Sequence, residues 1–232
     1  MTRQSISFVL PMFNEASGIE RTAKAVTTIA RDLADDYEII IVDDASTDSS
    51  GDIADSLSRA DSHIKSIRLR KNTKFGGALK AGLMAAVKDL VLYTDADLPV
   101  KEEDAKEALK LIGPADVVTA YSLVIKDSSL KRIIISKGYN FLVRLLFGLD
   151  IRDVNSGFKI YKRKVLEGIA LKSMSPFIDV EIFCEAMKRG FKIEQYGLIF
   201  QLRTKGKSTI SRFSVMARSF YDMFSYWLSQ SR

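Results

Sequence analysis

Leu90-Val-Leu-Tyr-Thr-Asp-Ala-Asp97 is the stretch of sequence that decides the fold. Its first five residues predict a fully buried strand, and two aspartates follow where that strand ends. A carboxylate pair at a strand end suits a divalent cation held against a diphosphate, because Mg²⁺ and Mn²⁺ take oxygen ligands from carboxylates and substrate phosphate. Open α/β sheets bind their ligands at this position, beyond the carboxyl ends of their strands.

Strands and helices alternate through the first half of the chain. We expect strands at 6–10, 37–42, 64–69, 90–94 and 116–120, and helices at 20–33, 46–58, 76–87 and 100–112. Pro11 is expected to stop the first strand. Apolar strands that alternate with helices are typical of a parallel sheet covered on both faces. The predicted fold is therefore α/β, with a mostly parallel central sheet flanked by helices.

Two broadly apolar helices are predicted in the second half, at 130–149 and 210–228. Their polar residues form narrow stripes at helical spacing, such as Arg132, Ser136 and Asn140 in the first helix. Helices with so wide an apolar surface are usually buried in a core or in a subunit interface. The alternative is a helix that lies in a membrane interface, with basic residues toward the headgroups. The sequence leaves both alternatives open.

The composition excludes several classes of site. The chain has 232 residues, 47% of them hydrophobic and 28% charged, which fits one large globular domain. It has one cysteine, Cys184, and one histidine, His63, so an internal disulfide and a Cys/His zinc site are excluded. His63 is expected in a surface turn rather than in a catalytic triad. The sparse cysteine usage favours a reducing, cytoplasmic setting, and no secretion signal or membrane-spanning run is recognised.

A net charge of +6 and an isoelectric point near 9.3 favour negatively charged partners. Phosphorylated substrates and an anionic membrane would both be attracted by this positive charge. Nucleic acid is disfavoured, because the basic residues are not interleaved with stacking aromatic residues.

Three predicted strands end in polar residues that should meet at one edge of a parallel sheet. These are Pro11-Met-Phe-Asn-Glu15, Asp43-Asp-Ala-Ser46 and Asp95-Ala-Asp97. Gly76 and Gly77 would allow close backbone approach near a helix N-terminus, which favours phosphate. A purely structural explanation is that Asp43, Ser46 and Asp48 cap a helix, but it accounts for one cluster and not for all three.

With these clusters the sequence resembles the family 2 glycosyltransferases, which have the GT-A fold. The resemblance rests on 9–15, on Ile41-Val-Asp-Asp-Ala-Ser-Thr-Asp48, on Asn72 with 76–82, and on Tyr93-Thr-Asp-Ala-Asp-Leu98. The second half resembles the branch of dolichyl-phosphate mannose and glucose synthases. The matching segments there are Arg132 with Ser136 and Asn140, 153–159, 177–181 and 203–208.

The resemblance implies a role for each matching residue. Asp95 and Asp97 would bind a catalytic Mg²⁺ or Mn²⁺ and the donor diphosphate. The nucleotide of a UDP- or GDP-sugar would be bound by Pro11, Phe13, Glu15, Asp43, Asp44, Gly76 and Asp95, the first four of them at the nucleoside. A polyprenyl phosphate acceptor would be bound by Arg132, Ser136, Ser156, Asp179, Arg203 and Lys205, and Arg132 and Arg203 would also act in catalysis. The implied reaction is sugar transfer with inversion at C1.

Two positions depart from the pattern of the branch. Pro99 occupies the place of a Gln or His that would be a further metal ligand, so the bound donor itself would complete the coordination of the metal. Thr119-Ala-Tyr-Ser122 lacks an arginine that usually follows the fifth strand. These departures keep a non-catalytic nucleotide-sugar-binding scaffold open as an alternative.

A phosphate acceptor and a saccharide hydroxyl acceptor would need different catalytic residues. A phosphate monoester is largely ionised at neutral pH, because its second pKa is about 6, and it can attack without a base. A saccharide hydroxyl acceptor, as in polysaccharide assembly, would need a general base, for which Asp153, Asp179 and Glu181 are the candidates.

The organisation that follows is a transferase domain over 1–209 and an amphipathic helix over 210–232. Within the domain, 1–122 would bind the nucleotide sugar and 123–209 the acceptor. We expect the protein at the inner face of the membrane, as a peripheral protein. The last helix would contact lipid, a second copy of the chain or a membrane-protein partner.

Overall fold

The computed structural model describes residues 4–96, 100–124, 130–200 and 213–230, and of residues 130–132 and 213 it describes the backbone alone. A single sheet of seven strands runs through this part of the chain in the order β3-β2-β1-β4-β6-β5-β7. The strands are β1 (Ser5–Met12), β2 (Asp36–Asp43), β3 (Ile64–Arg68), β4 (Leu90–Thr94), β5 (Val117–Ser122), β6 (Phe158–Lys162) and β7 (Ile193–Leu198).

The strand directions match the predicted, mostly parallel arrangement. β1 is parallel to β2 and β4, β2 is parallel to β3, and β5 is parallel to β7. Only β6 runs antiparallel to its neighbours β4 and β5 among the described strands. The reversal places Phe158, the first residue of β6, opposite Thr94, the last residue of β4. The segment before β6 therefore lies at the sheet edge where β4 ends.

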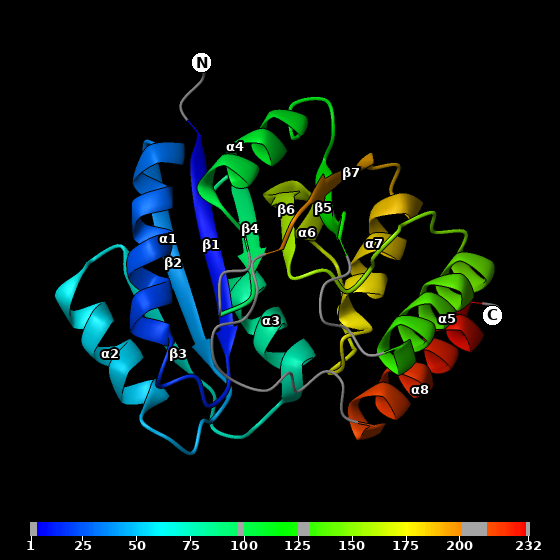
Figure 1. Ribbon diagram of the computed structural model, residues 1–232, viewed down its shortest axis with the longest axis horizontal. Helices are drawn as coiled ribbons and strands as arrows, with labels where there is room; N and C mark the ends of the chain where they lie inside the picture. The colour runs from blue at the N-terminus through cyan, green and yellow to red at the C-terminus, as the bar shows by residue number, and fades with distance from the viewer. Residues whose placement is uncertain (1–3, 97–99, 125–129, 201–212, 231–232) are drawn as a thin grey trace.

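Helices cover both faces of the sheet (Figure 1). One core lies under α1 (Ile19–Leu33), α2 (Ser50–Ala60) and α4 (Glu102–Leu111). The other lies under α3 (Lys74–Ala85), α5 (Leu130–Phe147), α7 (Ile178–Lys188) and α8 (Phe213–Gln230), with the short α6 (Arg163–Leu166) beside β6. Side chains alternate between the cores, so that Phe8 faces the first and Val9 the second.

The first strand does not end at Pro11, and the prediction that this proline stops it is wrong. β1 continues to Met12, and Pro11 lies opposite Val42 of β2. The pairing of β1 with β4 has already ended at Val9 and Tyr93, so β1 has one neighbour at this point. A proline is tolerated where a strand pairs on one side only, because its missing N–H is not needed by a second neighbour.

α5 and α8 lie side by side at one end of the molecule (Figure 1). They meet through Tyr139 and Phe220, whose rings are 5.5 Å apart. Within the described ranges, none of the helices combines the length and the hydropathy that crossing a bilayer requires. His63 is exposed in a turn between α2 and β3, as predicted, and its ring stacks on Tyr37 at 4.4 Å.

Candidate functional site

Asp43 ends β2 at the carboxyl edge of the sheet, where its side chain is buried. Its Oδ1 accepts a hydrogen bond of 3.1 Å from the backbone N–H of Ser46. Its Oδ2 points toward Gly51 at the start of α2, where an added Cβ would lie 2.6 Å from that oxygen and 2.7 Å from Nη2 of Arg68. Gly51 thus permits the carboxylate and the guanidinium to come together at the predicted nucleoside end.

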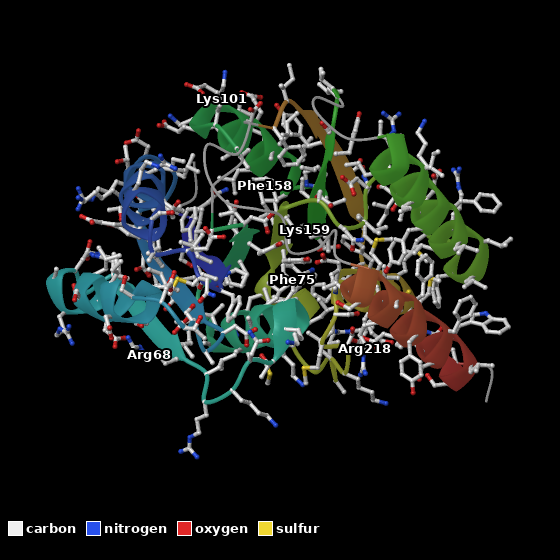
Figure 2. The ribbon with its side chains drawn as sticks, turned by 60° about the horizontal axis from the view of Figure 1, so that its bottom comes forward. Arg68, Phe75, Lys101, Phe158, Lys159 and Arg218 are labelled. Carbon is white, nitrogen blue, oxygen red and sulfur yellow. The ribbon has the colours of Figure 1, made fainter. Side chains whose placement is uncertain are left out.

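Arg68, the last residue of β3, was not among the predicted site residues. Its guanidinium pairs with Asp52 at 2.6 Å and with Asp55 at 3.0 Å, and the charge of Asp43 adds to the attraction. These carboxylates raise the pKa of Arg68, most of all through the hydrogen bond that Arg68 donates to Asp52. Figure 2 shows Arg68 at the edge of the molecule beside α2. Its position beside Asp43 becomes clear only from the pairing of β3 with β2, because the sequence does not distinguish it from the other arginines.

The β1–α1 loop is tied to the β2–α2 loop by hydrogen bonds. Asn14 adopts a left-handed conformation with φ of 57°, and its backbone N–H donates to Ser46 Oγ at 2.9 Å. The backbone N–H of Glu15 donates to Ser50 Oγ at 2.7 Å. Pro11, Phe13 and Glu15 are half-buried at this edge. The structure therefore brings the first and second predicted clusters together.

Asp44 connects β2 to the start of α3. Its buried Oδ1 accepts hydrogen bonds from the backbone N–H of Thr73 at 2.6 Å and from Thr73 Oγ1 at 2.8 Å. Burial raises the pKa of Asp44, and the bonds from Thr73 oppose that rise. The carboxylate thus fixes the N-terminus of α3, and its predicted contact with the nucleotide stays a prediction.

Gly76 is buried at the start of α3 and packs against the protein itself. Its N–H donates to the carbonyl of Met174 at 3.0 Å, and an added Cβ would lie 2.6 Å from the Met174 carbonyl carbon. The close backbone approach expected of this glycine is therefore made to the segment before α7. Its role in binding phosphate stays a prediction.

Asp95 follows β4 and is half-buried. Its N–H donates to the carbonyl of Gly157 at 3.2 Å, and its Oδ1 accepts a 2.7 Å hydrogen bond from the hydroxyl of Tyr93. A Cβ on Gly157 would lie 2.3 Å from Asp95 Oδ2, so the carboxylate occupies the space that any other residue would fill. This cradle and the hard oxygen donors fit Mg²⁺ or Mn²⁺. Asp97 and Pro99 lie outside the described residues.

The other predicted site residues are the partners of Asp95 at the metal ion and the basic residues that would bind the acceptor. Within the described ranges, no group of three or more His, Cys, Asp or Glu side chains is close enough to hold a metal ion. That Asp95 shares an ion with Asp97 and the donor is what the resemblance implies, and it stays a prediction. Arg203 and Lys205 lie outside the described residues, and of Arg132 only the backbone is described.

The described acceptor residues lie at different depths. Ser136 is exposed on α5, whereas Ser156 and Asp179 are 3% and 1% exposed. The carboxylate of Asp179 pairs with Lys159 of β6, with a distance of 3.2 Å between Oδ2 and Nζ. Burial raises the pKa of Asp179 most, Lys159 opposes that rise, and the charges of Asp95 and Asp153 add to it, so that the pKa lies at about 6. The predicted contact of Asp179 with the acceptor stays a prediction.

Comparison with known proteins identifies the fold and the family. The family model described as Glycosyl transferase family 2 matches residues 7–170, which is more than half of the chain. This chain belongs to glycosyltransferase family 2. The resemblance that the sequence suggested is thereby confirmed.

Curated relatives of this family 2 chain carry related names. It is 32% identical over 200 residues to Glycosyltransferase AglD of Haloferax volcanii, a match that covers 82% of this chain and 32% of the relative. It is 30% identical over 168 residues to Undecaprenyl-phosphate 4-deoxy-4-formamido-L-arabinose transferase of Salmonella choleraesuis, covering 71% of this chain and 50% of the relative. The chain thus spans about a third to a half of the length of these relatives.

Solved structures confirm the GT-A fold of the family 2 chain. Glucosyl-3-phosphoglycerate synthase from Mycobacterium tuberculosis, in complex with Mn²⁺, UDP-glucose and phosphoglyceric acid, superposes with a TM-score of 0.69 at 18% identity. That match covers 97% of this chain and 80% of the other. Mannosyl-3-phosphoglycerate synthase from Rubrobacter xylanophilus also gives a TM-score of 0.69 at 18% identity, covering 96% and 74%.

Proposed function

We propose that this chain transfers a sugar from a nucleotide diphosphate sugar to a polyprenyl phosphate, with inversion at C1. The observation that carries the proposal is the meeting of Asp43, the 11–15 segment and Asp95 at one edge of the sheet. The names of the curated relatives support the acceptor class, and the UDP-glucose complex of a structural neighbour supports the donor class.

The donor would lie along this edge, with its nucleoside near Asp43 and its diphosphate near Asp95. Asp95 and Asp97 would hold Mg²⁺ or Mn²⁺ there, and the ion would supply positive charge to the departing diphosphate. The hydrogen bond from Tyr93 and the cradle at Gly157 hold the Asp95 carboxylate in one position before the ion arrives. Such preorganisation avoids the cost of ordering the ligand when the donor binds.

A phosphate acceptor fits the acidic residues better than a saccharide hydroxyl does. Two of the three candidate bases are engaged inside the protein. Asp179 is paired with Lys159, and Glu181 accepts hydrogen bonds from the backbone N–H groups of Lys172 and Ser173 at 2.9 to 3.1 Å. A phosphate needs no base, because it is already ionised near neutral pH. Arg132 and Arg203 would attract it.

The lipid chain of the acceptor would be met by the outer surface of α5 and α8. Large apolar side chains are exposed there, and exposed patches of this kind mark interaction sites. They are Ile134, Phe141 and Leu145 on α5, and Tyr221, Phe224, Trp227 and Leu228 on α8. Lys137 and Arg144 are exposed on the same helix as the first group and would face anionic headgroups. A peripheral position at the inner face of the membrane follows from this proposal.

The test is transfer by the purified chain in the presence of lipid vesicles that contain a polyprenyl phosphate. A panel of UDP- and GDP-sugars would be supplied with Mg²⁺ or Mn²⁺, and the glycolipid would be detected by mass spectrometry. We expect product with one donor and none after chelation of the metal. A folded preparation that gives no product with any donor would refute the proposal, whereas donor binding without transfer would favour the scaffold alternative.

A matched pair of variants would connect activity to the site. Asp95→Asn removes the charge at the end of β4 and should abolish transfer. Asp36→Asn removes a charge at the opposite end of β2, where Asp36 is exposed and pairs with Lys88 at 2.7 Å, and should leave transfer unchanged. Equal activity of the two variants would argue against a metal at Asp95.

A further inference from the structure

Lys159 is the most unusual residue of the second half, because a lysine stands fully buried in the middle of the sheet. Its side chain has no exposed surface, and it lies opposite Tyr93 of β4 and Thr119 of β5. Figure 2 shows Lys159 at the centre of the molecule, near Phe75. An ammonium group is almost never fully buried without a partner, because removal from water is costly. Its surroundings should therefore show what it does.

The ammonium group of Lys159 has two close oxygen partners and two aromatic neighbours. It donates to the carbonyl of Ser156 at 2.5 Å and pairs with Asp179 Oδ2 at 3.2 Å. It also lies 5.3 Å from the ring centre of Tyr93 and 5.9 Å from that of Phe183. At these distances the ring faces attract a cation. Lys159 thus binds the segment before β6 and the ring of Tyr93 at the same time.

Both of these partners lead directly to Asp95. Tyr93 donates its hydroxyl to Asp95 Oδ1 at 2.7 Å. Gly157, which follows Ser156, accepts the hydrogen bond from the Asp95 N–H and packs against Oδ2. The groups that fix the Asp95 carboxylate from two sides are therefore themselves fixed by one buried cation.

The carboxylate of Asp179 is not satisfied by this arrangement in the way a structural ion pair usually is. Its Oδ1 is buried and has no hydrogen-bond partner among the described residues, and the same is true of the hydroxyl of Tyr161. A buried polar atom without a partner costs stability. A buried ion pair is weak evidence for stability, so the pair of Lys159 and Asp179 is compatible with a positioning role.

We propose that Lys159, held by Asp179, is a positioning residue for the metal-binding carboxylate of Asp95. The ammonium holds the Ser156–Gly157 backbone and the Tyr93 ring, and through them it keeps Asp95 oriented toward the ion. The inference rests on the proposed function, since it assumes that Asp95 binds a metal. Partners of this indirect kind typically contribute about 10- to 100-fold to metal affinity.

The experiment compares Mn²⁺ affinity with thermal stability in three variants. Lys159→Met keeps the length of the side chain and removes its charge. Tyr93→Phe removes only the hydroxyl that contacts Asp95. Ile160→Ala is the control, because Ile160 is fully buried in the same strand but faces the other core. Mn²⁺ binding would be measured by electron paramagnetic resonance in the presence of UDP, at a temperature at which each variant is folded.

We expect Lys159→Met to weaken Mn²⁺ binding by at least about tenfold and Tyr93→Phe by about tenfold. Ile160→Ala should lower the melting temperature and leave Mn²⁺ affinity within about twofold of the wild type, because a cavity in the other core does not touch Asp95. Wild-type affinity in both Tyr93→Phe and a folded Lys159→Met would overturn the inference. If Lys159→Met does not fold, Asp179→Asn takes its place, because it removes the carboxylate that holds Lys159, and wild-type Mn²⁺ affinity in that variant would overturn the inference. Failure of the wild-type chain to bind Mn²⁺ with UDP would instead refute the proposed metal site.

Discussion

Replacing Gly157 by alanine tests the geometry at Asp95 with a single added carbon. The φ of Gly157 is not positive, so alanine fits its backbone and any strain comes from contact alone. The added Cβ would lie 2.3 Å from Asp95 Oδ2 and 2.8 Å from its Cγ, whereas ordinary contact begins at 3.4 Å. The carboxylate or the backbone of Gly157 must therefore move by about 1.1 Å, since packed atoms do not overlap.

The size of this movement predicts a larger effect on function than on stability. A side chain turned about 30° from its preferred rotamer costs about 0.5–1.5 kcal/mol, which lowers the melting temperature of a chain of this size by about 1–6 °C. A reacting group misplaced by about 1 Å costs about 100-fold in rate, or about 2.7 kcal/mol of barrier. We therefore expect Gly157→Ala to remain folded while losing about 100-fold in transfer rate and about tenfold or more in Mn²⁺ affinity.

The assay is differential scanning fluorimetry beside Mn²⁺ titration in the presence of UDP, with transfer measured on the same preparations. Gly113→Ala is the control, because the nearest atom to its added Cβ is the carbonyl oxygen of Lys110 at 3.9 Å. That variant should match the wild type in all three measurements. Wild-type metal affinity and rate in Gly157→Ala would refute the reasoning, because they would mean that the carboxylate does not need the space that glycine leaves.

Three further predictions concern other parts of the molecule. Asp97→Ala should abolish metal-dependent donor binding, and unchanged titration calorimetry would reject Asp97 as a ligand. Burial raises the pKa of Asp179 to about 6, so between about pH 4 and pH 6 the folded chain holds a proton that the unfolded chain has released. The contribution of Asp179 to the free energy of unfolding should therefore fall by about 3 kcal/mol as the pH rises from 4 to 7, and urea titrations should show that Asp179→Asn loses this part of the slope. Phe141→Ser combined with Leu145→Ser should lower binding to anionic vesicles by about tenfold, whereas Met84→Ser, an equally exposed apolar residue on α3, should not; equal binding of both proteins in co-sedimentation would argue against a membrane contact through α5.

The sequence predicted the strands that alternate with helices in the first half, β1 to β5, and overlooked β6 and β7 in the second half. β4 is buried at every position and β2 from Tyr37 to Asp43, and their apolar runs at 39–42 and 90–93 make the pattern clear. β6 reads Phe-Lys-Ile-Tyr-Lys, and its two lysines hide a strand that is buried at its first four positions. β7 is half-buried at most positions and lies at the sheet edge, where the pattern is weakest. α7 was also overlooked, although Asp179 and Glu181 within it were recognised as candidates.

The residues of the site differ in the same way. Some are recognised from the sequence around them, whereas others are recognised only from contacts between distant segments. Asp43 and Asp95 could be predicted, because a strand end is visible in the chain and parallel strands share an edge. Arg68 and Lys159 could not, because their roles depend on partners far away in sequence. Lys159 meets Asp179 of α7 and Tyr93 of β4, and although it ends the matching segment 153–159, that segment alone does not reveal these partners.

The reversal of β6 explains why the Asp95 carboxylate is held so firmly at this edge. In a wholly parallel sheet, the strand beside β4 would bring its carboxyl end to the same edge, and the chain would then leave the edge as a loop. Because β6 is antiparallel, its first residue lies beside the last residue of β4. The turn at Ser156–Gly157 therefore approaches Asp95 from the neighbouring strand, and the residue two positions after Gly157 enters the core as Lys159. The segment 156–159 thus provides both the glycine beside which the Asp95 carboxylate fits and the lysine that holds the backbone next to that glycine.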